Sequence, residues 1–278
     1  GVPLVLHMHN TLPPRFSASI AALVGCSRYV ADWYRESGVP SPIIDVLPNG
    51  VDTQGLLPSS VSSRNVLRAK HAVPGNKFVI MYVGRIAEEK GPDRLVAAFS
   101  RLDPGRFHLV FLGEWRANIK GSGDKRAAFA ESLSRQVAKL PSGSVTVLGV
   151  FPPAVAQQLY GLGDLLVIPS RFEEPFSMVA IEAMASGLPV LAVRRGGMPE
   201  YMDHGVNALL MDGDSSPEAI AKAIEGAASD RDRLSRIALE ARQMVEKRFS
   251  WDEVARQTQD FYEGIVDCSG MARGEEGG

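Results

Sequence analysis

The stretch from Pro169 to Met184 combines polar residues with the start of a predicted helix. It follows a buried apolar run, and Ser177 has the residue type of an N-cap with Met178 at the first helical position. The free amides of Met178 and Val179 would then form an anion site at the positive end of the helix dipole. The stretch therefore predicts a place for a phosphate group.

Two carboxylates flank that helix start. Glu174 lies in the loop before it, and Glu182, four residues after Met178, lies on the same helix face. Carboxylates accept hydrogen bonds from hydroxyl groups, so the pattern indicates a polyhydroxylated phosphate ester as the ligand. A capped surface helix with solvated glutamates would have the same local sequence.

A second loop with residues suited to ligand binding runs from Gly84 to Gly91 and also follows an apolar run. Ligands of open α/β sheets bind beyond the carboxyl ends of the strands. Arg85 and Lys90 could both reach a diphosphate there, the guanidinium as a fork and the ammonium as a point charge. We expect both side chains in an exposed loop of a cleft. An ordinary charged surface loop is the alternative.

The glycine-rich segments do not form a known phosphate cradle. The Gly-Leu-Gly at 161–163 precedes a strand instead of a helix, and the Gly-Ser-Gly at 121–123 lacks a third glycine. The sequence also contains no Walker-type loop. Nicotinamide-dinucleotide and P-loop nucleotide sites are therefore not predicted.

Short apolar segments alternate with helical patterns over most of the chain. The apolar segments end at Gly or Pro, as is typical of strands buried on both faces. They occupy residues 78–83, 107–112, 144–148, 165–168 and 188–193, and helices are expected over 92–100, 125–140, 153–160, 178–186 and 217–227. This alternation predicts an α/β fold with a complete, Rossmann-like, doubly wound parallel sheet in the carboxyl-terminal part.

The first 74 residues have a different pattern. Strands are expected over 2–8, 21–26 and 43–47 and a helix over 27–36, after which Pro, Ser and Gly become frequent. The predicted domains are a partial amino-terminal α/β domain at 1–48, a linker at 49–74, the Rossmann-like domain at 75–250, a helix at 251–266 that packs back on the amino-terminal part, and a flexible tail at 267–278.

Composition restricts the classes of partner. Of 278 residues, 45% are hydrophobic and 22% charged, and the net charge of −2 argues against a nucleic-acid partner. Cys26 and Cys268 are far apart and form no zinc or disulfide pattern, which favours a reducing compartment. No apolar run approaches the roughly 20 residues that span a bilayer. We expect a cytoplasmic protein, either free or peripherally attached to a membrane.

Together, these segments resemble the family 4 glycosyltransferases, which are retaining enzymes of the GT-B fold. The resemblance covers about residues 1–265 and includes the loops described above, the Gly-Val at 149–150 and the Gly-Gly-Met-Pro-Glu at 196–200, in the family's order. Glu174 and Glu182 match the family's two-glutamate signature. One departure is Ser177, where the family often has Gly. Another is that roughly a hundred residues of the family's amino domain are absent, so we expect an amino-terminally truncated chain without most of the acceptor site.

The resemblance implies a role for each matching residue. Arg85 and Lys90 match the pair that binds the diphosphate, Glu182 the carboxylate that holds the ribose, and Glu174 the carboxylate near the transferred sugar. His9 matches a histidine that faces the donor sugar from the amino domain, with His7 as a rival. The remaining matches lie around the phosphate, the sugar and the base, and they are Gly84, Gly149, Val150, Ser177, Met178 and Val179. Gly197 and Glu200 are expected as scaffold residues, with Glu200 capping a following helix.

The implied activity is transfer of a hexosyl group from a nucleoside diphosphate sugar with retention and without a metal or other cofactor. Acceptors of this family are carbohydrates, lipid-linked molecules or small molecules. The sequence leaves two alternatives open. One is a nucleotide-sugar-binding fragment without turnover, and the other is a GT-B phosphorylase or epimerase.

Overall fold

The computed structural model describes residues 4–12, 20–39, 41, 43–115, 124–213 and 215–274. The first residues of the predicted strand at 2–8, the glycines at 121–123 and the last four residues of the predicted tail lie outside this part. In the part that is described, no helix is both long and apolar enough to cross a membrane.

The carboxyl-terminal part contains one six-stranded sheet in which every neighbouring pair is parallel. The strand order is β6-β5-β4-β7-β8-β9, which is the 3-2-1-4-5-6 order of a doubly wound Rossmann sheet. The strands are β4 (Phe78–Val83), β5 (Phe107–Leu112), β6 (Val145–Leu148), β7 (Leu165–Ile168), β8 (Val190–Val193) and β9 (Leu209–Met211). The predicted fold class is confirmed, although β9 was not predicted.

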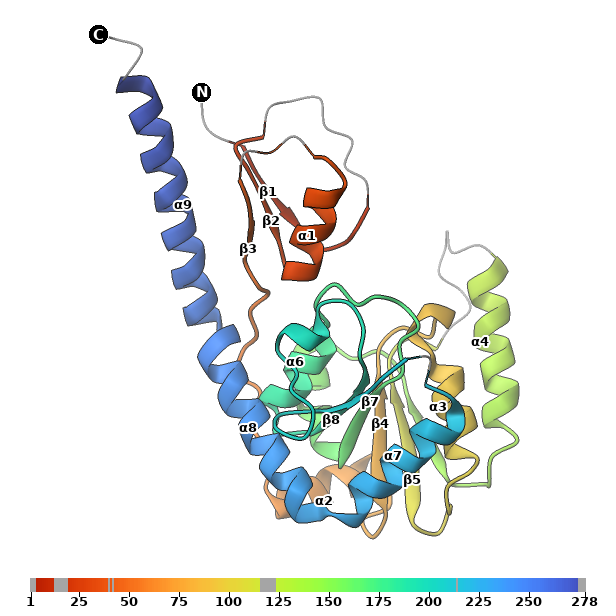
Figure 1. Cartoon of the computed structure of the whole chain (residues 1–278). Coiled ribbons are helices and arrows are strands. Elements are labelled where there is room, and N and C mark those ends of the chain that lie inside the picture. Colours follow the sequence, from red (N-terminus) through yellow and green to blue (C-terminus); the bar gives the residue numbers. More distant parts are fainter. Residues whose placement is uncertain are drawn as a thin grey trace.

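Helices cover both faces of this sheet, each over its own apolar core (Figure 1). On one face lie α3 (Pro92–Phe99), α4 (Asp124–Val137) and α7 (Pro217–Ser229). On the other lie α5 (Pro153–Leu159) and α6 (Met178–Ala185), while α8 (Arg231–Phe249) contributes to both cores. The sequence analysis predicted these helices except α8, whose long amphipathic pattern went unassigned.

A smaller sheet precedes this domain, as predicted for a partial amino-terminal unit. Strands β1 (Val5–Met8), β2 (Ala22–Gly25) and β3 (Ile44–Val46) pair in parallel, in the order of the chain. Helix α1 (Arg28–Glu36) packs on them, and the Ser27 hydroxyl caps it by accepting a hydrogen bond from the Val30 amide at 3.2 Å.

Two segments connect the units. The predicted linker contains a helix that was not predicted, α2 (Val61–Lys70), in which Arg68 is buried against Asp164. Helix α9 (Trp251–Gly274) returns to the amino-terminal unit, where the Tyr262 hydroxyl lies 3.0 Å from Nε2 of His7. The predicted return helix is therefore present, but it continues through residues 267–274, which were assigned to the flexible tail.

Candidate functional site

The strand order of the large sheet reverses between β4 and β7, and we call the carboxyl-terminal edge at this point the crevice. Strands β4 and β7 are neighbours, yet the chain leaves β4 toward β5 on one side and leaves β7 toward β8 on the other. Such a reversal opens the loops that follow the two strands, and ligands of open α/β sheets bind there. The two loops are residues 84–91 and 169–177, which are the two segments that the sequence analysis selected.

An ion pair joins these loops. Lys90 ends a short 3₁₀ helix (η1, Glu88–Lys90), and its Nζ lies 2.7 Å from Oε1 and 2.9 Å from Oε2 of Glu174. The Ser170 hydroxyl donates a further hydrogen bond of 2.5 Å to Oε1. The Glu174 side chain is 6% exposed and that of Lys90 is 23% exposed. The pair is thus largely shielded from water.

Two glycines allow the backbone to approach closely around this pair. Gly91 has a φ of +68°, and a Cβ at this position would lie 2.1 Å from the carbonyl oxygen of Pro169. Gly196 has a φ of +54°, and a Cβ there would lie 2.2 Å from the carbonyl oxygen of Glu174. Any larger residue would push the two loops apart, so both glycines set the position of the carboxylate.

The structure separates the two cations that the sequence analysis treated alike. Arg85 is 53% exposed, with its guanidinium 3.6 Å from a Glu89 carboxylate oxygen. Lys90 is instead held by a buried carboxylate, so the expectation that both are exposed loop residues is wrong for Lys90. The reason is that Gly91 turns the end of η1 against the loop of Glu174.

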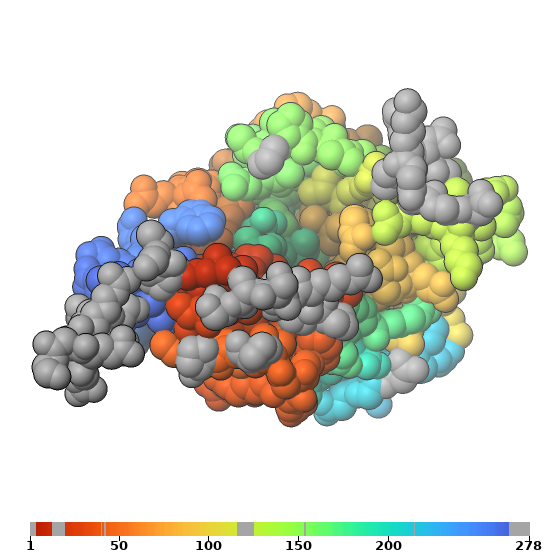
Figure 2. All heavy atoms as spheres, turned by 90° about the horizontal axis from the view of Figure 1, so that it is seen from above, coloured from red at the N-terminus to blue at the C-terminus, as the bar shows by residue number. Residues whose placement is uncertain are grey.

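A cavity of about 380 Å³ opens beside the crevice. Five of the predicted site residues line it together, namely Gly84, Arg85, Gly149, Val150 and Glu182. The rest of the wall comes from the ends of β4 and β5 (Val83, Leu112, Gly113 and Glu114) and from the α5 region (Phe151, Ala156, Gln157 and Tyr160). Viewed from above, the molecule is hollowed between the amino-terminal unit and the segments that contribute to this cavity (Figure 2). The size and mixed lining suit a small organic ligand with polar groups.

Glu182 points into this cavity from the second turn of α6. Its carboxylate Oε2 accepts a 2.6 Å hydrogen bond from the hydroxyl of Tyr160. Tyr160 is buried, with 2% of its surface exposed. Burial raises the pKa of Glu182, and the Tyr160 hydrogen bond opposes that rise. The sequence analysis did not identify Tyr160, because its relation to Glu182 depends on how α5 packs beside α6.

The start of α6 offers free backbone donors. Ser177 is the residue before the helix, as predicted, but it adopts a left-handed conformation with a φ of +70° and its side chain makes no capping hydrogen bond. The predicted side-chain cap is therefore wrong. Among the described residues, no acceptor faces the amides of Met178 and Val179. These amides remain available to an anion.

His9 and its rival His7 have different surroundings. His7 contacts Tyr262 of α9. Burial lowers the pKa of His7, and the charge of His9 lowers it further. His9 follows the carboxyl end of β1, where the Met8 carbonyl accepts a hydrogen bond from the Cys26 amide at 3.0 Å. The next residue, Ser27, meets Gly197 of the large domain. His9 thus belongs to the edge that faces that domain, and its role stays a prediction.

Glu200 connects the two units and does not cap a following helix. Its carboxylate accepts hydrogen bonds from the amides of Arg28, at 2.8 Å, and Tyr29, at 2.6 Å, which are the first residues of α1. Glu200 therefore caps a helix, as predicted, but that helix is α1 and not a following one. A carboxylate from one domain stabilises the positive end of a helix in the other.

Comparison with known families gives a match over most of the large domain. The profile described as Glycosyl transferases group 1 matches residues 63–244. Among curated relatives, the lipopolysaccharide 1,2-N-acetylglucosaminetransferase of Salmonella typhimurium is 29% identical over 95% of this chain and 68% of its own length. A D-inositol 3-phosphate glycosyltransferase of Xylanimonas cellulosilytica is 34% identical over 88% of this chain and 57% of its own length. The chain thus spans about half to two thirds of the length of these relatives.

Solved structures share the whole arrangement. Anabaena HepE in complex with UDP-glucose superposes with a TM-score of 0.80 at 25% identity, covering 94% of this chain and 72% of that protein. The complex of the same protein with UDP gives a TM-score of 0.81. Sucrose-phosphate synthase from Thermosynechococcus elongatus, at 24% identity and a TM-score of 0.75 over 89% of this chain and 59% of that protein, shares the fold.

Proposed function

Because the chain belongs to the family described as Glycosyl transferases group 1, we propose that it is the donor-binding portion of an enzyme that transfers a hexosyl group from UDP-hexose to an acceptor with retention. One observation carries the proposal. The 380 Å³ cavity beside the β4–β7 crevice is lined at once by Arg85, Glu182 and the Gly149–Val150 turn. The structures of HepE with UDP and UDP-glucose support the choice of nucleotide.

The proposed donor lies along the crevice with its nucleoside in the cavity. Glu182 accepts hydrogen bonds from the ribose hydroxyls, and the backbone of the Gly149–Val150 turn meets the base. Arg85 and the amides of Met178 and Val179 bind the diphosphate, together with Lys90. Glu174, which lies deeper between the loops, accepts hydrogen bonds from hydroxyls of the hexose.

The proposed chemistry follows from the charge of the leaving group. Negative charge grows on the nucleoside diphosphate as the glycosidic bond breaks, and donors fixed before the reaction stabilise it. Arg85, Lys90 and the start of α6 supply such donors from this chain alone, so the proposal requires no metal ion. The departing phosphate takes the proton of the acceptor hydroxyl as the new bond forms on the same face of the sugar. Retention then requires no nucleophile from the protein.

The acceptor is proposed in class only. The curated relatives are named for acceptors such as inositol 3-phosphate and lipopolysaccharide, so a hydroxyl of a carbohydrate, a small polyol or a lipid-linked glycan is the expected nucleophile. In this proposal His9 faces the donor sugar from the edge of the amino-terminal unit.

Calorimetric titration of the chain with UDP, GDP and ADP, each as free nucleotide and as the glucose conjugate, tests the proposal. We expect UDP and UDP-glucose to bind and the other nucleotides to bind more weakly. Absence of binding by every nucleotide would contradict it. Binding of UDP-glucose without transfer by a longer form of the protein would favour the non-catalytic fragment. Epimerisation of the sugar without an acceptor would favour an epimerase. Transfer of a glucosyl group from a glycan to orthophosphate, which forms glucose 1-phosphate, would favour a phosphorylase.

A further inference from the structure

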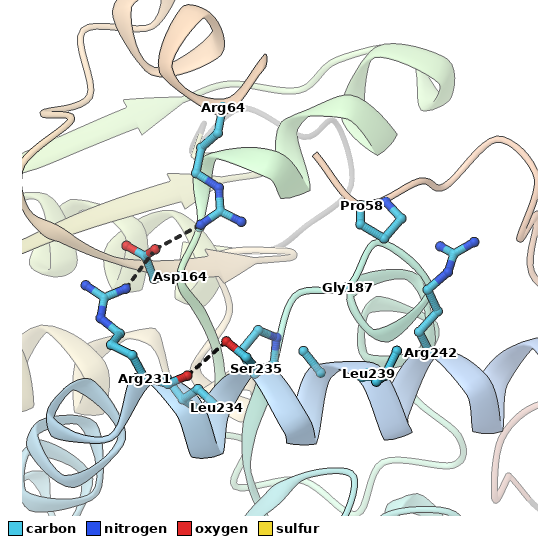
Figure 3. Close-up of a pocket in the computed structure, with 12 residues that line it drawn as sticks. Pro58, Arg64, Asp164, Gly187, Arg231, Leu234, Ser235, Leu239 and Arg242 are labelled. Atoms are coloured by element: carbon cyan, nitrogen blue, oxygen red, sulfur yellow. Dashed lines mark hydrogen bonds and ion pairs between the residues drawn. The ribbon is translucent and has the colours of Figure 1, made fainter. Parts of the chain in front are cut away.

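A second cavity, of about 290 Å³, lies at the opposite edge of the large sheet from the crevice. Asp164 at its floor immediately precedes β7, so the cavity sits beyond the amino ends of the strands. One wall is the linker with Pro58 and Arg64, and the other is α8 with Arg231 and Ser235 (Figure 3). None of the residues of the proposed donor site lines this cavity.

Three guanidinium groups share one carboxylate at this place. Oδ2 of Asp164 lies 2.9 Å from Arg68, and Oδ1 lies 3.1 Å from Arg64 and 3.2 Å from Arg231. Oδ2 also accepts a hydrogen bond of 2.7 Å from the Val79 amide. Both oxygens of Asp164 are thus fully engaged, and the cluster keeps an excess of two positive charges.

The neighbouring charged groups do not remove this excess. Arg242, on the far side of the cavity, is 16% exposed, pairs with Glu246 at 2.6 Å and donates to backbone carbonyls of Leu56 and Ala185. Asp230 accepts a hydrogen bond from the Arg233 amide as the cap of α8. Burial, Arg68 and Arg231 all lower the pKa of Arg64, and only Asp164 raises it.

The guanidinium of Arg64 also has an unused donor. Its side chain is 34% exposed, while its Nε is buried and has no hydrogen-bond partner among the described residues. Arg231 stacks over the ring of Phe78 at 4.5 Å and is 56% exposed. Figure 3 shows the two arginines reaching Asp164 from opposite walls of the cavity. Two guanidinium forks facing one space are suited to an anion that accepts several hydrogen bonds.

We propose that this cavity binds a phosphate dianion that contacts both Arg64 and Arg231 on the cavity side of Asp164, either as orthophosphate or as the phosphoryl group of a small phosphomonoester. The double negative charge matches the excess of the arginine cluster, and the volume leaves room for a short organic group. Because Arg64 belongs to α2 and Arg231 to α8, the bound anion joins the linker to α8, which is followed by the return helix α9. Binding therefore stabilises the native state of the chain.

Isothermal titration calorimetry of the full chain at constant ionic strength tests this site, with orthophosphate and glycerol 3-phosphate as separate probes. Arg231→Ala is the main variant, because that side chain is more than half exposed. We expect it to weaken binding about tenfold, the effect of one lost charged hydrogen bond. Arg64→Gln is expected to act in the same direction. Arg236→Ala, an exposed residue of α8 outside the cavity, is the matched control and should bind as the parent does.

Binding of either probe that depends on Arg231 supports the site, and the probe that binds more tightly identifies a free phosphate or an ester as the ligand. The proposal is overturned if neither probe binds, or if Arg231→Ala and Arg236→Ala bind equally well. It is also overturned if Arg85→Ala abolishes binding while Arg231→Ala does not, because the anion would then occupy the donor crevice.

Discussion

The ammonium of Lys90 lies 2.7 and 2.9 Å from the two carboxylate oxygens of Glu174, across the crevice between the β4 and β7 loops. A lysine ammonium has three N–H donors, and this arrangement uses two of them. The third has no hydrogen-bond acceptor among the described residues, and the ring of Phe172 lies 5.1 Å from Nζ. The pair is neutral as a unit. Arg85 is also near a carboxylate, but its contact with Glu89 is longer, at 3.6 Å, and both side chains are exposed, so Arg85 and the start of α6 are more accessible to a diphosphate. Lys90 therefore orders the site as well as contributing to binding.

Replacement of Lys90 is expected to destabilise the fold. Lys90→Ala leaves the Glu174 carboxylate buried without its cation, and loss of one partner of a buried pair costs about 3 kcal/mol. Urea denaturation followed by circular dichroism measures the free energy of unfolding. The double variant Lys90→Ala/Glu174→Gln should recover part of the loss. If Lys90→Ala unfolds at the parent's urea concentration, the pair does not stabilise the crevice.

Arg85 is expected to affect binding and leave stability unchanged. Its side chain is 53% exposed and lines the 380 Å³ cavity. Arg85→Ala should weaken UDP binding by about 1–3 kcal/mol, the scale of a lost charged hydrogen bond. Arg135→Ala, an exposed arginine of α4, is the control. Equal UDP affinity in the parent, Arg85→Ala and Arg135→Ala would remove Arg85 from the site.

Local patterns predicted most of the elements and both loops, but not β9, α2 or α8. Strand alternation and loop chemistry are encoded within a few residues, which is why they could be predicted. Both crevice loops were selected from sequence, and five of the proposed residues do line one cavity. Contacts between distant segments were not accessible in this way. The Tyr160–Glu182 hydrogen bond depends on the packing of two helices. Glu200 was predicted to cap a following helix, but it caps α1, which it reaches through an amide 171 residues earlier in the chain.

The error at Ser177 has a similar origin. Its residue type is that of an N-cap, but the cap conformation is extended, whereas Ser177 has a φ of +70°. The loop before Ser177 is held by the Gly197 amide, which donates a hydrogen bond of 2.8 Å to the Glu174 carbonyl, so the conformation of Ser177 depends on a segment that is distant in the sequence. Only the resemblance to a family that often has Gly at this position hinted at it.

Ser177→Gly is therefore expected to stabilise the protein. A non-glycine residue in the left-handed region costs about 1 kcal/mol or more, and glycine removes that cost. The amides of Met178 and Val179 stay in place, so UDP affinity should be unchanged. Thermal denaturation and calorimetry measure the two quantities. Ser177→Ala is the control, since it keeps the strain. A melting temperature of Ser177→Gly that is no higher than that of Ser177→Ala would show that the left-handed conformation carries no such cost.

Glu174→Gln is expected to separate sugar recognition from nucleotide recognition. The amide has a single acceptor oxygen, so it cannot serve Lys90, Ser170 and a sugar hydroxyl together. Free UDP should bind this variant with little change, whereas the advantage of UDP-glucose over UDP should disappear. Competition calorimetry with both ligands measures that ratio. An unchanged ratio would place the hexose away from Glu174.

UDP binding is expected to depend on pH through the buried carboxylate of Glu182. Burial raises the pKa of Glu182 above its ordinary value of 4.5, so the native state binds this proton more tightly than the unfolded chain does. The stability that this contributes is present at low pH and is lost as the pH rises through the raised pKa. The pH dependence of ribose binding has the opposite sign to that of stability, because the ionised carboxylate accepts hydrogen bonds from both ribose hydroxyls. UDP affinity should therefore fall as the pH falls through that same pKa.

Tyr160→Phe tests this argument without a large change in volume. The variant removes the hydrogen bond that opposes the rise in the pKa of Glu182, so the midpoint of the loss of UDP affinity should move to higher pH. Glu182→Gln removes the titrating group, and its weaker UDP binding should no longer depend on that ionisation. Calorimetry across the acidic range measures all three proteins. Tyr160 would be a packing residue only, without influence on the carboxylate, if the parent and Tyr160→Phe lost affinity at the same pH.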